Sequence, residues 1–282
     1  MTTGFADELL ARSILSDRSA VAPEWYAWFS DLCNTDVLDR IAGEYVRNIP
    51  RQTLYDFMQI GRSYIAEIAC LAAGVNRKFG RVHAHPIAAI VDYMDGRANT
   101  LADALRAAGG IKYIANELSS NASNNSLPST LRADISNRTI FLVTAHESSA
   151  YLIATACLVL KRAPDTPTRD AVRTAADLDF PIQSVLRETT KDLRWGDFPL
   201  WKEQKIRVHI GAAFGGGRQP NRSFGIGANA CPGAKLALAA TEAFVKNIRP
   251  LLPQTTFFEQ NRRTSLAART FRRLNASTDL IT

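Results

Sequence analysis

The sequence lacks the paired cysteines that stabilise small secreted proteins or hold structural zinc. Its four cysteines, Cys33, Cys70, Cys157 and Cys231, have no CxxC spacing. A disulfide framework or a zinc site is therefore disfavoured, and a reducing, cytoplasmic environment fits the composition. Three of the four lie in apolar, helix-like sequence, where cysteine usually packs as a small hydrophobic side chain. Only Cys231 lies in a glycine-rich segment.

The sequence also lacks a secretory leader, a membrane span and a nucleic-acid-binding pattern. The opening residues MTTGFADELLARS are mixed in character, with no apolar run before a cleavage site. The longest apolar stretches are interrupted by His, Glu, Ser or Lys. The formal net charge of +7 comes from basic residues spread along the chain, without interleaved aromatic residues. We therefore expect no membrane and no nucleic-acid partner, and an acidic protein suits the charge better.

Helical periodicity dominates the sequence that is present. Apolar residues recur at three- and four-residue spacing, and the longest such pattern runs from Ile135 to Leu160. The segments that we expect to be helical are 5–17, 51–74, 135–160, 181–194 and 234–248.

Turn residues and one strand complete the predicted outline. Gly109 and Gly110 predict a turn, the polar tract 119–129 predicts a loop, and APDTPT at 163–168 ends the long helix. Residues 205–210 form the clearest short strand. The prediction is one mainly α domain over residues 1–282, with little β-structure.

The strongest local signal is FGIGANACPGAKLA, residues 224–237. Its glycines can adopt positive φ and let the backbone approach a flat ligand closely. Cys231 comes just before the helix expected at 234–248, where Pro232 suits the first helical position. A helix N-terminus favours thiolate over thiol, so Cys231 is a candidate metal ligand.

Two other interpretations of this segment remain open. Gly225 to Ala230 fits the loose dinucleotide pattern GxGxxA, but no strand leads directly into it and no acidic residue follows at the usual distance. Alternatively, the glycines form a purely structural loop around a buried cysteine.

A second polar feature interrupts the long helix at Thr144-Ala145-His146-Glu147-Ser148-Ser149. An acid followed by two hydroxyls inside an apolar helix is costly unless these groups are paired or face a cavity. A helix with one polar stripe is the simpler interpretation.

Together these segments resemble the cytochrome P-450 family. The Phe, Gly, Gly, Cys, Gly and Leu-Ala spacing of 224–237 is similar to that family's haem-ligand loop, and the likeness extends in order over residues 9–282. The resemblance implies a reduced, mainly α P-450-like fold that binds haem b. Its expected contacts with the haem are Cys231 as the iron ligand, Phe224 packed on the cysteine side, and the loop glycines Gly225, Gly227 and Gly233.

The segment FLVTAHESSAYLIA looks like the family's helix beside the oxygen site. The resemblance implies that Ala145 leaves room for oxygen, while Glu147 and Ser148 deliver protons during oxygen activation. Arg40 falls where the family often grips a haem propionate. Glu188 matches the glutamate of a bracing Glu-x-x-Arg pair, with Lys191 in place of the arginine. Lysine keeps the positive charge but lacks the planar guanidinium that can bind two partners.

The chain also departs from the family pattern. Little sequence precedes residue 9, so we expect the first helix and the first strands of the usual small sheet to be absent. Glu188 and Cys231 are only 43 positions apart, so we expect the strands that face the missing ones to be lost as well. Exposed apolar surface would then be covered by a homodimer or a partner protein. Asn229 replaces a basic residue that usually holds a propionate.

The resemblance implies a haem-thiolate oxidative enzyme, monooxygenase-like and biosynthetic, acting on a small, largely apolar metabolite. Non-oxygenase rearrangement, dehydration or cyclisation on the same scaffold is the first alternative, and a haem-free, non-catalytic partner protein is the second. An acidic ferredoxin or flavodoxin would dock on basic residues near the cysteine side of the haem. The alternative is that these residues only form a solvated helix face. They are Lys235, Lys246, Arg249, Arg262 and Arg263. The sequence does not indicate the substrate.

Overall fold

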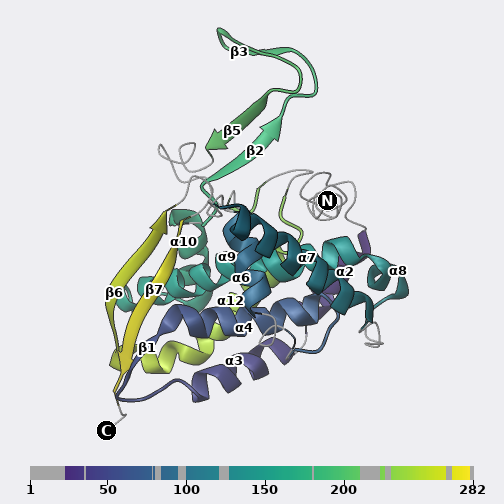
Figure 1. Ribbon diagram of the computed structural model, residues 1–282. Coiled ribbons are helices and arrows are strands. Elements are labelled where there is room, and N and C mark those ends of the chain that lie inside the picture. Colours follow the sequence, from purple (N-terminus) through teal and green to yellow (C-terminus); the bar gives the residue numbers. More distant parts are fainter. Residues whose placement is uncertain are drawn as a thin grey trace.

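The computed structural model describes residues 23–34, 36–77, 79, 84–94, 100–120, 127–179, 181–209, 223–225, 230–264 and 269–279. Helices dominate this part of the chain, which confirms the mainly α prediction (Figure 1). They are α2 (Pro23–Cys33), α3 (Val37–Arg47), α4 (Phe57–Ala72), α6 (Ala84–Met94), α7 (Leu101–Ser120), α8 (Ser129–Ala133), α9 (Ile135–Arg162), α10 (Thr168–Leu178) and α12 (Ala234–Ile248), followed by a 3-10 turn η3 (Arg249–Gln254).

Helix α9 runs through the middle of the molecule and packs against α4, α6, α7, α10 and α12. From Asn137 to Cys157 its residues are buried, with the exception of Thr144, Ala145, Glu147 and Ser148. It is long and apolar enough to cross a membrane, but 67% of its most apolar window is buried inside the protein. Its apolar character therefore serves the core.

A buried arginine joins α9 to the ends of three other helices. Arg138 is 0% exposed, and its Nε donates to the Ala73 carbonyl after α4 at 2.8 Å. Its Nη1 donates to the Arg132 carbonyl of α8 at 2.9 Å and to the Leu118 carbonyl of α7 at 3.4 Å. These carbonyls lie in the last turns of their helices, where no further intrahelical partner exists. The guanidinium therefore fixes where α4, α7 and α8 end against α9.

A three-stranded antiparallel sheet, in the order β1-β7-β6, flanks the helices. Its strands are β1 (Leu54–Asp56), β6 (Thr255–Thr264) and β7 (Arg269–Thr278). Asp56 joins the sheet to α4. Its Oδ1 accepts from the Met58 amide at 3.0 Å, which caps α4, and from the Leu274 amide of β7 at 3.2 Å.

Two smaller sheets form a projection that we call the arm, residues 182–209. Strands β2 (Ser184–Glu188) and β5 (Lys205–His209) pair antiparallel, and between them β3 (Leu193–Trp195) and β4 (Phe198–Leu200) form a hairpin. Figure 1 shows the arm extending away from the helices, with β3 at its far end.

Three predictions about individual elements are confirmed. The long helix begins at Ile135 as predicted and ends at Arg162, just before the proline-rich turn. The helix at 234–248 has the predicted bounds, and the strand at 205–210 is present as β5, with residue 210 outside the described part. The helix expected at 5–17 and most of the loop at 119–129 also lie outside it.

Four other predictions are wrong. The segment 181–194 is not a helix but contains β2 and β3, because pairing with β5 and β4 overrides its helix-like spacing. The strands expected to be lost are therefore present as the arm. In 51–74, helix begins only at Phe57, after the Asp56 cap. Gly109 and Gly110 lie inside α7, where a Cβ at Gly110 would come within 3.1 Å of the Pro86 carbonyl of α6.

Candidate functional site

The cysteine loop is closed by one backbone hydrogen bond. The Cys231 amide donates to the Phe224 carbonyl at 2.6 Å, and Gly225 has a φ of +74°, which favours glycine. Helix α12 begins at Ala234, and Gly233 at its N-cap offers no side-chain acceptor to the first amides. Cys231 is half-buried. Gly227 and Asn229 lie outside the described residues.

Two other cysteines have surroundings that keep them protonated. Burial raises the pKa of the Cys157 thiol, which lies in the core on α9. Burial also raises the pKa of Cys33, although the charge of Lys235 partly opposes this effect. Neither thiol is a candidate ligand on these grounds.

Four residues of α9 between Asn137 and Cys157 are only partly buried, and we call them the α9 strip: Thr144, Ala145, Glu147 and Ser148. Both hydroxyls of the strip donate back into the helix, from Ser148 Oγ to the Thr144 carbonyl at 3.1 Å and from Thr144 Oγ1 to the Ile140 carbonyl at 2.8 Å. Each hydroxyl oxygen can still accept a hydrogen bond from a ligand. The three residues predicted as catalytic therefore lie together on this strip.

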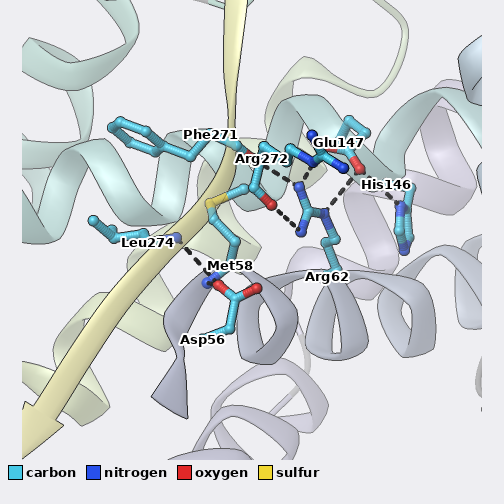
Figure 2. A network of polar contacts seen from close by, with 8 residues as sticks. All are labelled: Asp56, Met58, Arg62, His146, Glu147, Phe271, Arg272 and Leu274. Carbon is cyan, nitrogen blue, oxygen red and sulfur yellow. Dashed lines mark hydrogen bonds and ion pairs between the residues drawn. The ribbon is translucent and has the colours of Figure 1, made fainter. Parts of the chain in front are cut away.

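Glu147 is held by an arginine that the sequence did not reveal (Figure 2). Arg62 on α4 donates from Nε to Glu147 Oε1 at 2.8 Å and from Nη2 to Oε2 at 3.1 Å. The same guanidinium donates to the carbonyls of Phe271 at 2.8 Å and Arg272 at 3.3 Å on β7. This bidentate pair fixes α4, α9 and the sheet together. Arg62 is 85 positions from Glu147, so no local spacing could have indicated the contact.

His146 lies beside this ion pair but faces the core. It is 6% exposed, and its Nδ1 has no hydrogen-bond partner in the part of the chain that the structure describes. Burial lowers the pKa of His146 to about 4, and the charge of Arg62 acts in the same direction, while Glu147 opposes it. The imidazole is therefore neutral at pH 7.

The cysteine loop and the α9 strip pack on one shared core. Phe224 and Ala145 both contact the cluster of buried residues from α9, α12, α4 and β7. Helix α12, which follows Cys231, also packs directly against α9. Phe224 and Cys231 lie at the N-terminal end of α12, and the α9 strip borders the same core as Phe224.

Arg40 is not brought into that region. It is exposed on α3, next to Asp39, which accepts from Lys246 Nζ at 3.0 Å and from Asn247 Nδ2 at 3.3 Å. Those two residues lie at the C-terminal end of α12, and a helix of that length spans about 22 Å. Arg40 therefore lies at the opposite end of α12 from Cys231.

The predicted docking residues are also spread apart. Lys235 lies in the first turn of α12 and donates to Ser30 Oγ at 2.6 Å. Lys246 pairs with Asp39, Arg249 donates to the Pro164 carbonyl at 2.7 Å, and Arg262 pairs with Asp179 at 3.3 Å. The side chain of Arg263 is outside the described residues. Only Lys235 is thus seen beside the cysteine loop.

The bracing pair predicted from Glu188 and Lys191 is not formed on a helix. Glu188 ends β2 opposite Lys205, and Lys191 is exposed between β2 and β3. Helix α10, which follows α9, contains no glutamate.

An open groove of about 1270 Å³ lies elsewhere, between α3 and α4. Buried Glu67 in its wall accepts from Tyr45 Oη at 2.7 Å and from Arg77 Nε at 2.8 Å. Arg77 also pairs with Glu44, so the charges of the groove are matched internally. None of the predicted site residues lines it.

No protein-family model matches the sequence, and no curated protein does either. Solved structures match it in fold. CalO2 has a TM-score of 0.77 at 17% identity, over 98% of this chain and 84% of CalO2. CxnD, a cytochrome P-450 enzyme for C–S bond formation in chuangxinmycin biosynthesis, has a TM-score of 0.77 at 15% identity, over 99% and 82% of the two chains. Cytochrome P-450 BioI, in complex with acyl carrier protein ligated to hexadec-9Z-enoic acid, has a TM-score of 0.75 at 12% identity, over 96% of this chain and 82% of BioI. The chain has the cytochrome P-450 fold.

Burial of His146 predicts acid sensitivity. The unfolded chain takes up a proton near pH 6.5, whereas the folded protein takes it up only near pH 4. Stability contributed by the neutral imidazole is therefore complete above pH 6.5 and falls as the pH drops to 4, by up to about 3 kcal/mol. Urea unfolding of the wild type and His146→Gln at pH 7 and pH 4.5 measures this effect.

The variant should lose less stability than the wild type between these two pH values. His209→Gln, which removes an exposed histidine of β5, should retain the wild-type dependence. An equal loss in wild type and His146→Gln would contradict the assignment.

Proposed function

We propose that this chain is a haem-thiolate oxidative enzyme, with haem b held through Cys231 and a small, largely apolar metabolite as its substrate. The observation that carries the proposal is the position of Cys231 just before the start of α12, in a chain with the cytochrome P-450 fold. No side chain caps the first amides of α12, and the N-terminal end of a helix favours a thiolate. When bound, a thiolate-ligated haem supplies oxidation by dioxygen or peroxide.

The residues around Cys231 fit a flat, metal-bearing group. The bond from the Cys231 amide to the Phe224 carbonyl holds the aromatic residue against the core beside the thiol. At Gly233 no heavy atom lies within 4 Å of the place a Cβ would occupy, so the start of α12 has open space. Gly225 and Gly227 would let the backbone approach the ligand face.

The accessible strip of α9 supports an oxygen and substrate site. Ala145 is small enough to leave space. Ser148 Oγ can accept a hydrogen bond from a ligand while its own hydroxyl donates to the Thr144 carbonyl. The surrounding α9 residues are buried and mostly apolar, which suits a small apolar substrate. CxnD is described as acting in a biosynthetic pathway, and we propose a biosynthetic role here as well.

A second candidate is rearrangement, dehydration or cyclisation without oxygen transfer. The specific observation that favours it is the Arg62–Glu147 ion pair, which occupies both carboxylate oxygens. Glu147 can relay a proton only when this pair opens. Arg40, moreover, is exposed next to Asp39, which contacts the C-terminal end of α12 and not the end that follows Cys231.

For the oxidative candidate, an acidic ferredoxin or flavodoxin would supply electrons. Lys235, which is exposed in the first turn of α12, is the described basic residue that supports docking near Cys231. The small number of such residues predicts a weak, salt-sensitive encounter.

Haem titration tests the proposal directly. Purified protein should bind added haem in one-to-one ratio, and its Soret band should shift strongly to the red on reduction under carbon monoxide. Cys231→Ala should lose this red shift, whereas Cys33→Ala should keep it, because Cys33 is half-buried at the end of α2. Protein that takes up no haem would contradict both enzymatic candidates and favour a haem-free partner.

The α9 strip distinguishes the two enzymatic candidates. With haem bound, indole as an apolar probe, and ferredoxin with its reductase in excess, Ser148→Ala and Glu147→Gln should lower product formed per oxygen consumed by about tenfold or more. Ser149→Ala, a buried neighbour outside the strip, should not. If both strip variants form as much product per oxygen consumed as the wild type, Ser148 and Glu147 do not deliver protons. That result would favour the second candidate.

A further inference from the structure

The arm exposes an unusual cluster of aromatic side chains. Trp195 is 76% exposed, Phe198 is 73% exposed and Trp201 is 63% exposed. Other exposed large apolar residues, such as Leu54, Leu101 and Phe258, lie on separate elements. Isolated exposed hydrophobic residues are ordinary, but a contiguous aromatic cluster indicates an interaction surface.

Strand register places the apolar residues of the hairpin on one face. Trp195 pairs with Phe198, and Leu193 pairs with Leu200, across a two-residue turn in which Gly196 has a φ of +58°. Because alternate residues of a strand point to the same side, these four side chains share a face. A lone two-stranded hairpin is marginally stable in water, so covering this face would stabilise it.

The base of the hairpin is held by hydrogen bonds. Thr189 donates its amide to the Gln204 carbonyl at 3.1 Å and accepts from the Glu203 amide at 2.7 Å. The Lys202 amide donates to Asp192 Oδ1 at 2.7 Å, and the Trp201 amide donates to Gln204 Oε1 at 2.9 Å. The aromatic face is thus preorganised, which reduces the entropy lost on binding.

Charges of both signs are interleaved along the arm. Its six basic residues are Arg187, Lys191, Arg194, Lys202, Lys205 and Arg207, and its four acidic residues are Glu188, Asp192, Asp197 and Glu203. These carboxylates would weaken the attraction of the basic residues to a phosphate backbone or an anionic lipid surface. Asp197 lies in the turn between Trp195 and Phe198, so inserting the tip into a bilayer would bury a carboxylate.

A second copy of the chain is complementary to this pattern. In a two-fold contact the same surface meets itself, so an apolar face covers an apolar face and each acidic residue can lie near a basic one. Each aromatic side chain can bury 150–250 Å². At their observed exposures, three from each of two arms would remove roughly 800–1,000 Å² from water. With the flanking strands this approaches the lower end of stable interfaces, about 1,200 Å².

We propose that the arm is a dimerisation element, in which the face formed by Leu193, Trp195, Phe198 and Leu200 packs against the same face of a second copy. Trp201 lies at the edge of this contact. The proposal does not depend on haem binding, because no residue of the cysteine loop or the α9 strip takes part.

Sedimentation velocity of the full chain over a range of micromolar concentrations tests the proposal. Wild-type protein should be dimeric, and the double variant Trp195→Lys/Phe198→Lys should be monomeric, with association at least about tenfold weaker. Leu101→Lys alters an equally exposed apolar residue on α7 and should leave the dimer intact. Far-UV circular dichroism establishes that each variant is folded.

Iodide quenching of tryptophan fluorescence gives a second measurement. Quenching should fall with protein concentration in the wild type, as Trp195 and Trp201 become covered, and should not change with concentration in the variant, where Trp201 stays exposed. Wild-type protein that remains monomeric throughout would overturn the proposal, as would a dimer that survives the double substitution. Binding of monomers to vesicles containing phosphatidylserine would overturn it in favour of a lipid surface.

Discussion

The constraint on which the rest of the structure depends is the burial of most of α9. A helix covered by other elements cannot leave charged groups without partners, and α9 carries both Arg138 and Glu147. Arg138 donates from Nε and Nη1 to carbonyls at the ends of three helices, and Glu147 pairs with Arg62, which also binds two carbonyls of β7. These two arginines therefore determine how α4, α7, α8 and the sheet are arranged around the central helix. The accessible strip is notable because it interrupts this otherwise complete cover.

The sequence predicted the elements whose patterns are long and local. Helices α9 and α12 follow from apolar periodicity, and their ends follow from proline and glycine residues nearby. The cysteine loop and the residues of the α9 strip were also identified from the sequence, because both depend on neighbours within a few positions. What these groups bind was implied only by the family resemblance.

Contacts between distant segments could not be predicted. The segment 181–194 was predicted as a helix but contains β2 and β3, because the pairing of β2 with β5 joins positions about twenty residues apart. Arg62 was missed since nothing near it in sequence marks its bond to Glu147. Gly110 predicts a turn from sequence alone, whereas in the structure it lies inside α7 and allows the close approach of α6. Arg40 fits the family order along the chain, but only helix packing shows that its neighbour Asp39 contacts the C-terminal end of α12.

The account rests on Cys231 being the ligand of a bound iron. X-ray absorption at the iron edge of haem-loaded protein measures this most directly, because it distinguishes sulfur from nitrogen and oxygen neighbours. The account predicts one sulfur neighbour in the wild type and none in Cys231→Ser. A wild-type spectrum without sulfur, or a sulfur neighbour that persists in the variant, would contradict it.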